Sequence, residues 1–561
     1  MGSIAAQAEE QGFRVLETTL SVDEKVMEDT GTPATIPAAY VEKEGTVYLL
    51  KENGTMERIG STDYWNKIMQ FRVSDKKVAA ISTDIHRQRP MMDCGLCDCH
   101  KNTTALLNVA VTNRCDLRCW YCFFYEEKAG FIFEPTVEEI LEGIRAAEKY
   151  NGYIPPVQIT GGEPAMRRDL DAIIRGAVEM GSPHVQLNTN SVSVGIDYYQ
   201  QPDRAIQRVN RWVQAGLKTI YTSFDGVSPD SKSDPKNHYE VPFALQAYID
   251  GGIKSTVLVP TVSQLNLRET PDIVRFAVHN LERGIKAVNF QPLSMVGYIK
   301  KGDREKLRVV QSDIVEELQK AFGFGMEAWY PVPTVASLAD IVGRRSHYDI
   351  HFYNNEKCGI ATYAYVDRDR HQLLPITEFI DVDRFIKDIS ALDQSLLKKV
   401  AFGARLLKDR LKHETFRKAL AQRLSEYIIR DELPNGELLS GMLEEIIEKG
   451  DYSTLRKFHY SFIFLGMMHF QDYYNYDVHR VERCSIHYSA GHRLIPFCTY
   501  NVFPSIHRDR FLEEHRVTGE RAQRLHEESR QAKERVEAFR KNIDEIVQSP
   551  IYQDIYDFGA W

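Results

Sequence analysis

The sequence predicts an α/β protein built on a partial (β/α)6 barrel, with a small β-rich module before the barrel and a mostly helical region after it. Three observations lead to this fold class. Strand and helix patterns alternate from about residue 105 to 300, short strand-like runs separated by turn residues precede them, and helical spacing dominates from about residue 305 onward. Six strand–helix repeats suit an open barrel better than a closed barrel of eight strands.

Residues 1–90 form the predicted β-rich module. Two strand-like runs flank the dipeptide Glu44-Gly45, and a second turn follows at Asn53-Gly54. This pattern predicts a β-hairpin with a further turn after it.

Residues 91–330 form the predicted barrel. We expect its six strands in the segments LLNVAVT, PVQIT, HVQLNTN, TIYTSF, STVLVPTV and AVNFQPL, with a helical pattern after each of the first five. Repeated β–α units of this kind place parallel strands side by side in a sheet that is buried on both faces.

Residues 331–520 are predicted to be mostly helical, with two cysteine-containing interruptions, and residues 521–561 to form a charged C-terminal helix. The apolar run 462–470 is expected to be a core helix. Its Met467, Met468 and Phe470 are also candidates for lining a dry pocket for an apolar chain, because methionine adapts to irregular apolar surfaces.

The composition limits the possible functions. Hydrophobic residues make up 43% of the 561 residues, charged residues 27%, and the net charge is -9, which argues against a nucleic-acid binder with a broad basic face. The apolar stretches are too short to span a bilayer, and no secretory signal pattern is visible, so we expect a cytoplasmic protein. Six of the nine cysteines fall between Cys94 and Cys122, which favours metal or redox chemistry over disulfides.

The motif C-x3-C-x2-C, formed by Cys115, Cys119 and Cys122, follows the first barrel strand. Three thiolates from one loop can hold three irons of a [4Fe-4S] cube and leave the fourth iron open. S-adenosylmethionine (SAM) can occupy that iron, and one electron then cleaves it to a 5′-deoxyadenosyl radical. A structural zinc knot is the alternative, but zinc knots take four ligands, commonly as two C-x2-C pairs.

A second motif follows the next predicted strand: Gly161, Gly162, Glu163 and Pro164. Glycines allow the backbone to approach a ligand closely, and Glu163 is a candidate acceptor for the SAM ammonium group.

In this order, the two motifs resemble the radical SAM superfamily. The resemblance implies that Tyr121 lies near the adenine, and that Asn188, Asn190, Ser223 and Asp225 at strand ends contact the ribose and carboxylate of SAM. Each of these five is equally compatible with an ordinary capping or turn role. Hydrogen-atom abstraction depends on proximity and orientation, so we expect no catalytic side chain beyond the cluster and SAM ligands.

Longer stretches narrow the resemblance. They are DCGLCDCHKNTTALLNVAVTNRCDLRC, VNFQPLS, KCGIATYAYV, GMMHFQDYYNYD and CSIHY…GHRLIPFCTYN, and they resemble the archaeal tetraether lipid synthase family, some of whose members carry the name of pterin methylases. The resemblance implies C–C bond formation between unactivated sp3 carbons of lipid isoprenoid chains, by joining or ring closure. It also implies auxiliary [4Fe-4S] clusters and an N-terminal rubredoxin-like iron site.

The sequence departs from that family in its cysteines. There is none before Cys94, so the N-terminal module is expected to be a rubredoxin-like remnant without metal, and the family's third cysteine after CGLC falls at Ala105. Six cysteines remain beyond the SAM cluster, too few for two complete four-cysteine clusters. Our candidate ligands for at least one auxiliary cluster are Cys94, Cys97, Cys358, Cys484 and Cys498, with Cys99 as a substitute and His100 as a further possibility. A buried cysteine is otherwise often a small apolar residue.

Three functions stay open at this point. The first is a radical SAM enzyme acting on a lipid alkyl chain, and the second a radical SAM methylase of a pterin-like molecule. The third is a non-catalytic iron–sulfur electron-transfer protein. The expected partners are a hydrophobic small-molecule substrate and a reductant such as ferredoxin or flavodoxin, with no nucleic acid and at most transient membrane contact.

Overall fold

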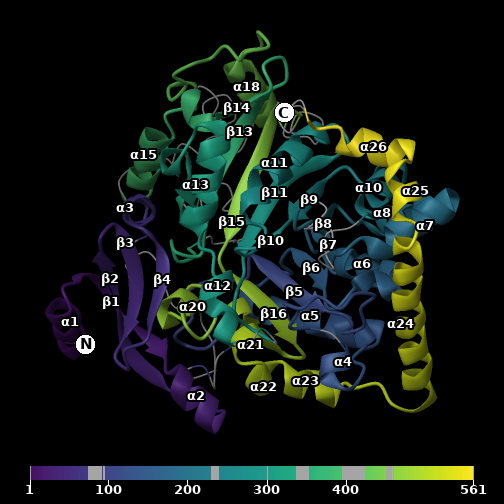
Figure 1. The fold of residues 1–561 in the computed structure, drawn as a ribbon, viewed down its shortest axis with the longest axis horizontal. Helices are drawn as coiled ribbons and strands as arrows, with labels where there is room; N and C mark the ends of the chain where they lie inside the picture. Colours follow the sequence, from purple (N-terminus) through teal and green to yellow (C-terminus); the bar gives the residue numbers. More distant parts are fainter. Residues whose placement is uncertain are drawn as a thin grey trace, which may run out of the picture.

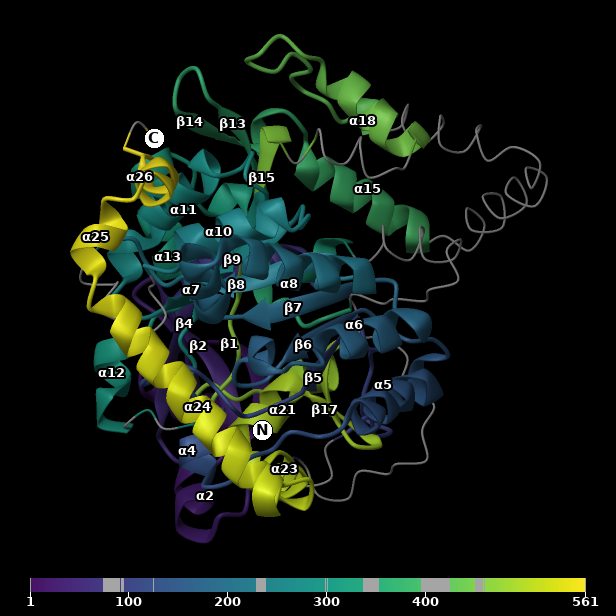
Figure 2. The same cartoon turned by 90° about the vertical axis from the view of Figure 1, so that its right-hand side faces the viewer.

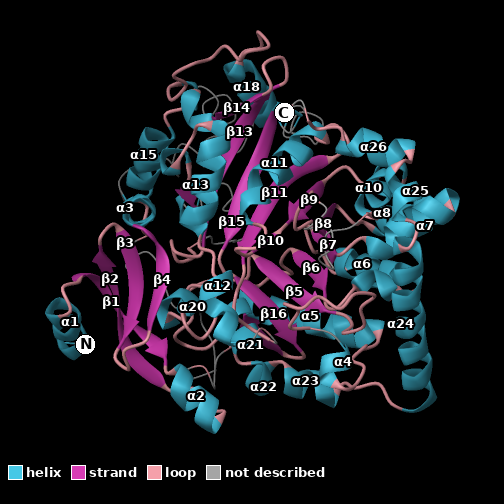
Figure 3. Ribbon diagram, viewed as in Figure 1, coloured by secondary structure: helices cyan, strands magenta, loops and turns pink. Residues whose placement is uncertain are grey.

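The computed structural model shows two β-sheets surrounded by helices (Figures 1 and 3). It describes residues 2–73, 91, 95–124, 126–228, 239–297, 299, 301–335, 353–394, 424–449, 458, 460–559 and 561. No helix in these ranges is long and apolar enough to cross a membrane.

The N-terminal sheet has four antiparallel strands in the order β1-β2-β3-β4, at one side of the molecule (Figure 1). They are β1 (Arg14–Val22), β2 (Thr35–Lys43), β3 (Thr46–Lys51) and β4 (Met56–Ser61). Glu44 and Gly45 both have positive φ, 52° and 79°, as the tight turn between β2 and β3 requires. The predicted hairpin is therefore confirmed.

The second sheet contains the predicted barrel. Its six parallel strands lie in the order β11-β9-β8-β7-β6-β5 and are β5 (Leu106–Ala110), β6 (Val157–Thr160), β7 (Val185–Thr189), β8 (Thr219–Ser223), β9 (Thr256–Val259) and β11 (Ile285–Pro292). The helices that follow the first five strands are α5 (Val137–Asn151), α6 (Leu170–Glu179), α7 (Val192–Gln200) with α8 (Pro202–Ala215), α10 (Val241–Asp250) and α11 (Thr270–His279). The predicted α/β fold class is confirmed.

The C-terminal region adds strands to both edges of these six, which the sequence analysis did not anticipate. They are β13 (Gly359–Asp367), β15 (Phe462–Met468), β16 (Ile486–Ala490) and β17 (Arg493–Pro496). Strand β15 pairs in parallel with β11, and β16 pairs in parallel with β5. Both free edges of the partial barrel are thus covered by later parts of the chain.

The expectation of a core helix at residues 462–470 is wrong, because residues 462–468 form β15. Phe462, Ile463, Leu465 and Met467 are all buried, between β11 on one side and β13 on the other. A strand that is buried on both faces has a continuous apolar run without alternation, and such a run has no period that separates it from a helix.

The charged C-terminal helix predicted over residues 521–561 is confirmed only in part. Helix α24 (Gly519–Arg540) runs along the outside of the barrel, and two short helices, α25 (Ile543–Val547) and α26 (Pro550–Tyr556), follow it (Figures 1 and 2). Two arginines of α24 form ion pairs with acidic groups of the barrel: Arg535 with Asp197 at 2.7 Å and Arg540 with Glu240 at 2.9 Å. The helix therefore docks through charges, as expected of a polar helix.

Buried charges join the N-terminal sheet to the rest of the protein. The guanidinium of Arg308 lies 2.9 Å from Glu57 of β4 and 2.7 Å from Asp472, which follows β15. Asp477 accepts hydrogen bonds from Tyr40 of β2 and Thr19 of β1, both at 2.7 Å. These pairs fix the N-terminal sheet against the segment that carries two of the candidate cysteines.

Candidate active site

A cavity of about 1770 Å³, counting its open mouth, lies inside the barrel. Alternate residues of the parallel strands face it, because side chains of a strand point to opposite sides in turn. The cluster loop after β5, the segment after β15 and the start of α21 (Phe497–Val502) complete its wall. The structure therefore brings parts of both cysteine-rich regions to one space.

The three cysteines of the C-x3-C-x2-C motif all line this cavity. Backbone N–H groups point at two of the sulfur atoms: Leu117 donates to Cys115 Sγ at 3.4 Å, and Phe124 donates to Cys122 Sγ at 3.3 Å. Such donors favour the charged thiolate form. Three thiols on one loop facing a common space fit the three protein ligands of an open [4Fe-4S] cluster.

The base of the cluster loop is fixed by Arg114, a buried residue whose guanidinium contacts Glu134 at 2.7 Å. Tyr121, inside the loop, faces the cavity and donates a hydrogen bond from its hydroxyl group to Asp225. Asp225 also accepts the backbone N–H of Thr261 at 2.7 Å. Asp225 thus lies behind the cavity wall and ties the cluster loop to the ends of two strands.

Gly161 and Gly162 line the cavity where the loop after β6 crosses the cluster loop. A Cβ atom on Gly161 would lie 2.2 Å from the carbonyl oxygen of Thr112, and one on Gly162 would lie 2.3 Å from that of Arg114. Gly162 donates to Thr112 at 2.8 Å and Glu163 donates to Arg114 at 2.7 Å through their backbone N–H groups. Only glycine allows this approach.

The Glu163 side chain does not line the cavity. Its carboxylate accepts hydrogen bonds from Ala165 N–H at 2.9 Å, the Thr189 hydroxyl at 2.7 Å and Asn190 N–H at 2.6 Å. Burial raises the pKa of Glu163 to about 7, and the nearby charge of Asp116 adds to the shift. Pro164 begins the short helix Pro164–Met166 directly after it. In this structure the pair anchors the glycine loop to β7.

Asn188, Asn190 and Ser223 line the cavity from the ends of β7 and β8. Asn188 donates to the Thr160 hydroxyl at 3.3 Å, and Asn190 donates to Asp116 of the cluster loop at 2.7 Å. The Asn190 amide also reaches Cys115 Sγ at 3.8 Å. The strand-end polar groups expected from the sequence therefore meet the cluster loop at one edge of the sheet.

Three other cysteines gather beside this cavity, and Cys498 lines it. The thiol of Cys484 interacts electrostatically with Cys498 and Cys358, and burial raises its pKa. His469 N–H donates to the carbonyl of Cys358 at 3.0 Å, while Gln471 N–H donates to Cys498 Sγ at 3.4 Å. The segment after β15 thus links two of the three, and we name Cys358, Cys484 and Cys498 the C-terminal thiol group.

Arg480, a residue the sequence analysis missed, is buried against the C-terminal thiol group. Its guanidinium interacts electrostatically with the thiols of Cys358 and Cys498. It also donates to the carbonyl of His469 at 2.7 Å. Nothing in the sequence separated this arginine from others, because its partners come from distant segments.

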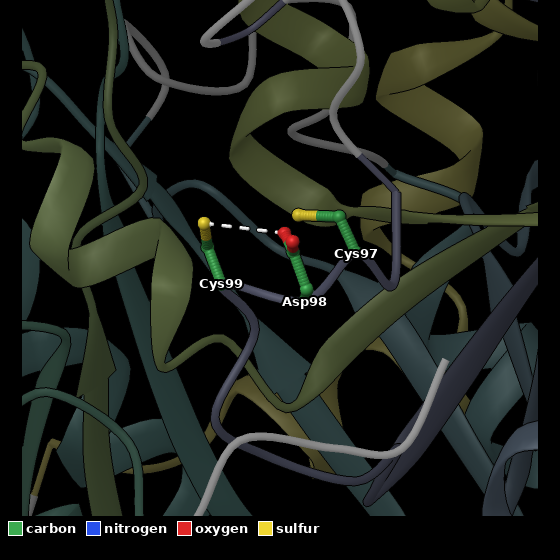
Figure 4. Close-up of side chains that lie close together, drawn as sticks. All are labelled: Cys97, Asp98 and Cys99. Carbon is green, nitrogen blue, oxygen red and sulfur yellow. Dashed lines mark hydrogen bonds between the residues drawn. The ribbon is translucent and has the colours of Figure 1, made fainter. Parts of the chain in front are cut away.

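The remaining predicted ligands lie on one loop. Cys97, Asp98 and Cys99 offer ligand atoms within 4.8 Å of one another, and the Cys99 thiol reaches Asp98 at 3.4 Å (Figure 4). Cys97 and Cys99 border a small pocket of about 10 Å³ next to Glu482. His100 contacts the carbonyl of Cys484 at 2.8 Å, which connects this loop to the C-terminal thiol group. Cys94 lies outside the described residues.

Carboxamide side chains in the barrel interior were also missed. Asn108, Gln158, Gln186, Asn289 and Gln291 line the cavity. They stand on β5, β6, β7 and β11, and their sequence patterns do not distinguish them from ordinary strand positions. Among the described residues that line the cavity, none is Asp, Glu, Lys, Arg or His.

Comparison with known proteins agrees with this geometry. The description "Radical SAM superfamily" matches residues 109–277, which include the three-cysteine loop and the Gly161–Pro164 motif. A protein of Methanocaldococcus jannaschii named 7,8-dihydro-6-hydroxymethylpterin dimethyltransferase is 33% identical over 510 residues, which cover 88% of this chain and 95% of that protein. A probable GTP 3′,8-cyclase of Sulfurisphaera tokodaii is 26% identical over 217 residues, 38% of this chain and 64% of that protein.

Solved structures overlap with parts of the fold. Streptococcus suis SuiB matches with a TM-score of 0.30 at 15% identity, covering 45% of this chain and 49% of SuiB. The maturase HydG of Carboxydothermus hydrogenoformans matches with a TM-score of 0.30 at 13% identity, covering 46% of this chain and 55% of HydG. The relative from Methanocaldococcus jannaschii is similar over almost its whole length, and the superfamily match falls on the barrel that holds the three-cysteine loop, so the chain belongs to the radical SAM superfamily.

Proposed function

We propose that this radical SAM enzyme abstracts a hydrogen atom from an unactivated sp3 carbon of a lipid isoprenoid or alkyl chain, as a step in C–C bond formation by chain joining or ring closure. The single observation that carries the proposal is the apolar wall of the cavity, which consists of Phe123, Phe124, Leu293, Val296, Met468, Phe470, Ile486 and Phe497. Phe123 and Phe124 directly follow Cys122, so this wall begins at the cluster loop. A reactive carbon radical needs such a dry surface.

Cluster and SAM together supply a 5′-deoxyadenosyl radical; the protein holds and shields them. Cys115, Cys119 and Cys122 would bind three irons. Asn188, Asn190 and Ser223 would contact SAM, with Tyr121 beside it and Asp225 fixing Tyr121. Because the Glu163 carboxylate already accepts three protein hydrogen bonds, we assign the ammonium group to the backbone of Gly161 and Gly162, with Glu163 and Pro164 holding that backbone in place.

The C-terminal thiol group is our proposed auxiliary [4Fe-4S] site. Three partly buried thiols beside a buried cation suit a thiolate cluster, and Cys498 brings the site to the cavity wall. Cys97 is the candidate for a fourth ligand, because its loop contacts Cys484 through His100. We also propose that the N-terminal sheet is a structural remnant that binds no metal.

A second candidate is methylation of a pterin-like heterocycle. Two observations favour it: the carboxamides inside the barrel suit a hydrogen-bonding ring, and the relative from Methanocaldococcus jannaschii is named for such a reaction. A nucleoside triphosphate is a poor fit, because no Lys or Arg occurs among the described residues that line the cavity.

The test is isotope transfer. Reconstituted enzyme is incubated with SAM, reductant and a perdeuterated isoprenoid diether lipid, and 5′-deoxyadenosine is analysed by mass spectrometry. Deuterium in the 5′-deoxyadenosine, absent in the Cys115→Ala variant, supports the lipid proposal, and the product mass separates joining from ring closure. Abundant unlabelled 5′-deoxyadenosine with the lipid, and label with a deuterated dihydropterin instead, would move the assignment to the second candidate.

A further inference from the structure

We propose that the strand side of the cavity recognises an uncharged, hydrogen-bonding group of the substrate, which binds inside the barrel against the carboxamides. This inference rests on the proposed function only in assuming that the substrate occupies this cavity.

The first observation is a ladder of carboxamides across three neighbouring strands. Asn108, Gln158 and Gln186 are register partners on β5, β6 and β7, so they share one face of the sheet. Gln186 donates to Gln158 at 2.6 Å, and Gln158 donates to Asn108 at 2.7 Å. These hydrogen bonds fix the orientation of the Gln158 and Gln186 amide groups. All three side chains still line the cavity.

The second observation comes from β11, on the other side of the cavity. Asn289 and Gln291 are two residues apart, so both point to the cavity. Neither side chain makes a hydrogen bond within the described part of the chain, although both are partly buried. Gly466 lies opposite Asn289 on β15, and a Cβ there would come within 3.3 Å of the Asn289 amide oxygen. Two unpartnered amides facing the ladder make a site for donors and acceptors of a ligand.

The third observation is the absence of charge from the described cavity lining. A phosphate group of the substrate at the strand side of the cavity would lose its water and gain no protein cation in exchange, which is strongly unfavourable. Carboxamides instead match a neutral group that both donates and accepts hydrogen bonds. Two sources carry this chemistry: the glyceryl hydroxyl end of an ether lipid, and the ring of a neutral pterin-like heterocycle.

Binding without turnover tests the inference. Reconstituted enzyme with SAM and without reductant is titrated calorimetrically with 1-O-hexylglycerol, its phosphate ester and 6-hydroxymethyl-7,8-dihydropterin. We expect one of the neutral probes to bind at least tenfold more tightly than the phosphate ester, and the better neutral probe identifies the source. Equal or tighter binding of the phosphate ester, or binding of none of the probes at millimolar concentration, would overturn the inference.

Variants then locate the site. Asn289→Leu and Gln186→Leu should each weaken the binding of the better neutral probe by at least tenfold. Gln214→Leu, a control on the exposed face of α8, should leave that binding unchanged. Unchanged binding in Asn289→Leu, which breaks no hydrogen bond of the described protein, would also contradict the inference. No radical forms in this binding experiment. The inferred binding site can therefore be confirmed even if no deuterium is transferred from a lipid, so a failure of this inference is distinguishable from a failure of the proposed function.

Discussion

The ring of Phe470 stacks on the ring of Phe497, with centroids 4.0 Å apart and planes inclined by 26°. Phe470 follows β15, at one edge of the six parallel strands, and Phe497 follows β17, beyond the other edge. Both rings line the cavity. Two segments of the C-terminal region therefore meet between the two edges of the barrel sheet, and this closure places the aromatic pair in the cavity wall.

This closure predicts which change uncouples the cleavage of SAM from product formation. Phe497→Leu keeps an apolar side chain but removes the stacked ring, so water and small molecules gain access to the cavity. We expect several-fold more 5′-deoxyadenosine per molecule of product than in the wild type. Quantitative mass spectrometry of both species gives the ratio. The control is Phe511→Leu, which removes a ring that packs against Phe133 away from the cavity, and a ratio that rises equally there would refute the role of the stack.

The fold and the cluster loop were accessible from the sequence because their signals are local. The triplet Cys115, Cys119 and Cys122 lies within eight residues, and the strands that bracket it have ordinary strand patterns. The glycine motif was found for the same reason. Its glutamate was interpreted differently, as an acceptor for SAM, because the sequence does not show that Thr189 and Asn190 donate to it from β7.

The rest of the site depends on register and on long-range pairing. Asn108 and Gln158 become a pair only when β5 and β6 align, and Arg480 reaches Cys358 across more than a hundred residues. Strand β15 was mistaken for a helix, since the strands that bury it on both sides are not visible in its own sequence. Such features require the fold itself.

Arg480 predicts a property of the proposed auxiliary cluster. A fixed positive charge beside the thiolates stabilises the reduced, more negative state, so Arg480→Gln should lower the reduction potential of that cluster. We expect at least a tenfold shift of the one-electron equilibrium, which corresponds to 59 mV. Redox titration followed by electron paramagnetic resonance measures it. Arg480→Lys should retain most of the potential, and the SAM cluster serves as an internal reference that should not move.

The buried ion pair between Lys51 and Glu24, next to the N-terminal sheet, predicts an effect on the stability of the protein. Lys51 ends β3 and Glu24 begins the helix α2 (Glu24–Thr30), and their side chains pair at 2.8 Å while Asn53 and Thr55 also donate to Glu24. Lys51→Met leaves a buried carboxylate unpaired and should destabilise the protein by about 3–5 kcal/mol. Urea unfolding measures the loss, and iron content should stay at the wild-type value.

A double variant separates the contribution of the Lys51–Glu24 ion pair from that of the other contacts of Lys51. In Lys51→Met with Glu24→Leu no buried charge remains, so most of the lost stability should return. A double variant as unstable as Lys51→Met would show that the contacts of the Lys51 ammonium with the carbonyls of Val22 and Tyr473 matter more than its pairing with Glu24.

Asp472 predicts a pH dependence of stability. Burial alone would raise its pKa, but the Arg308 guanidinium at 2.7 Å and the Met295 N–H hold the pKa at about 2, below its ordinary value of 3.8. A carboxyl group with a lowered folded-state pKa stabilises the fold above the unfolded pKa and loses that contribution as pH falls through the folded one. The contribution is about 2–3 kcal/mol, complete near neutral pH and lost progressively between about pH 4 and pH 2.

Asp472→Asn should therefore cost about 3–5 kcal/mol at pH 7, because it leaves Arg308 with only Glu57 in a buried setting. The difference from wild type, measured by urea unfolding, should shrink as the pH is lowered from 5 to 3. Asp272→Asn is the control: its exposed pair with Arg275 contributes at most about 1 kcal/mol, so its unfolding curve should follow the wild type at each pH. A difference in unfolding free energy between wild type and Asp472→Asn that stays constant over this pH range would mean that Arg308 does not hold Asp472 ionised. The link between the N-terminal sheet and the segment after β15 would then depend on packing instead.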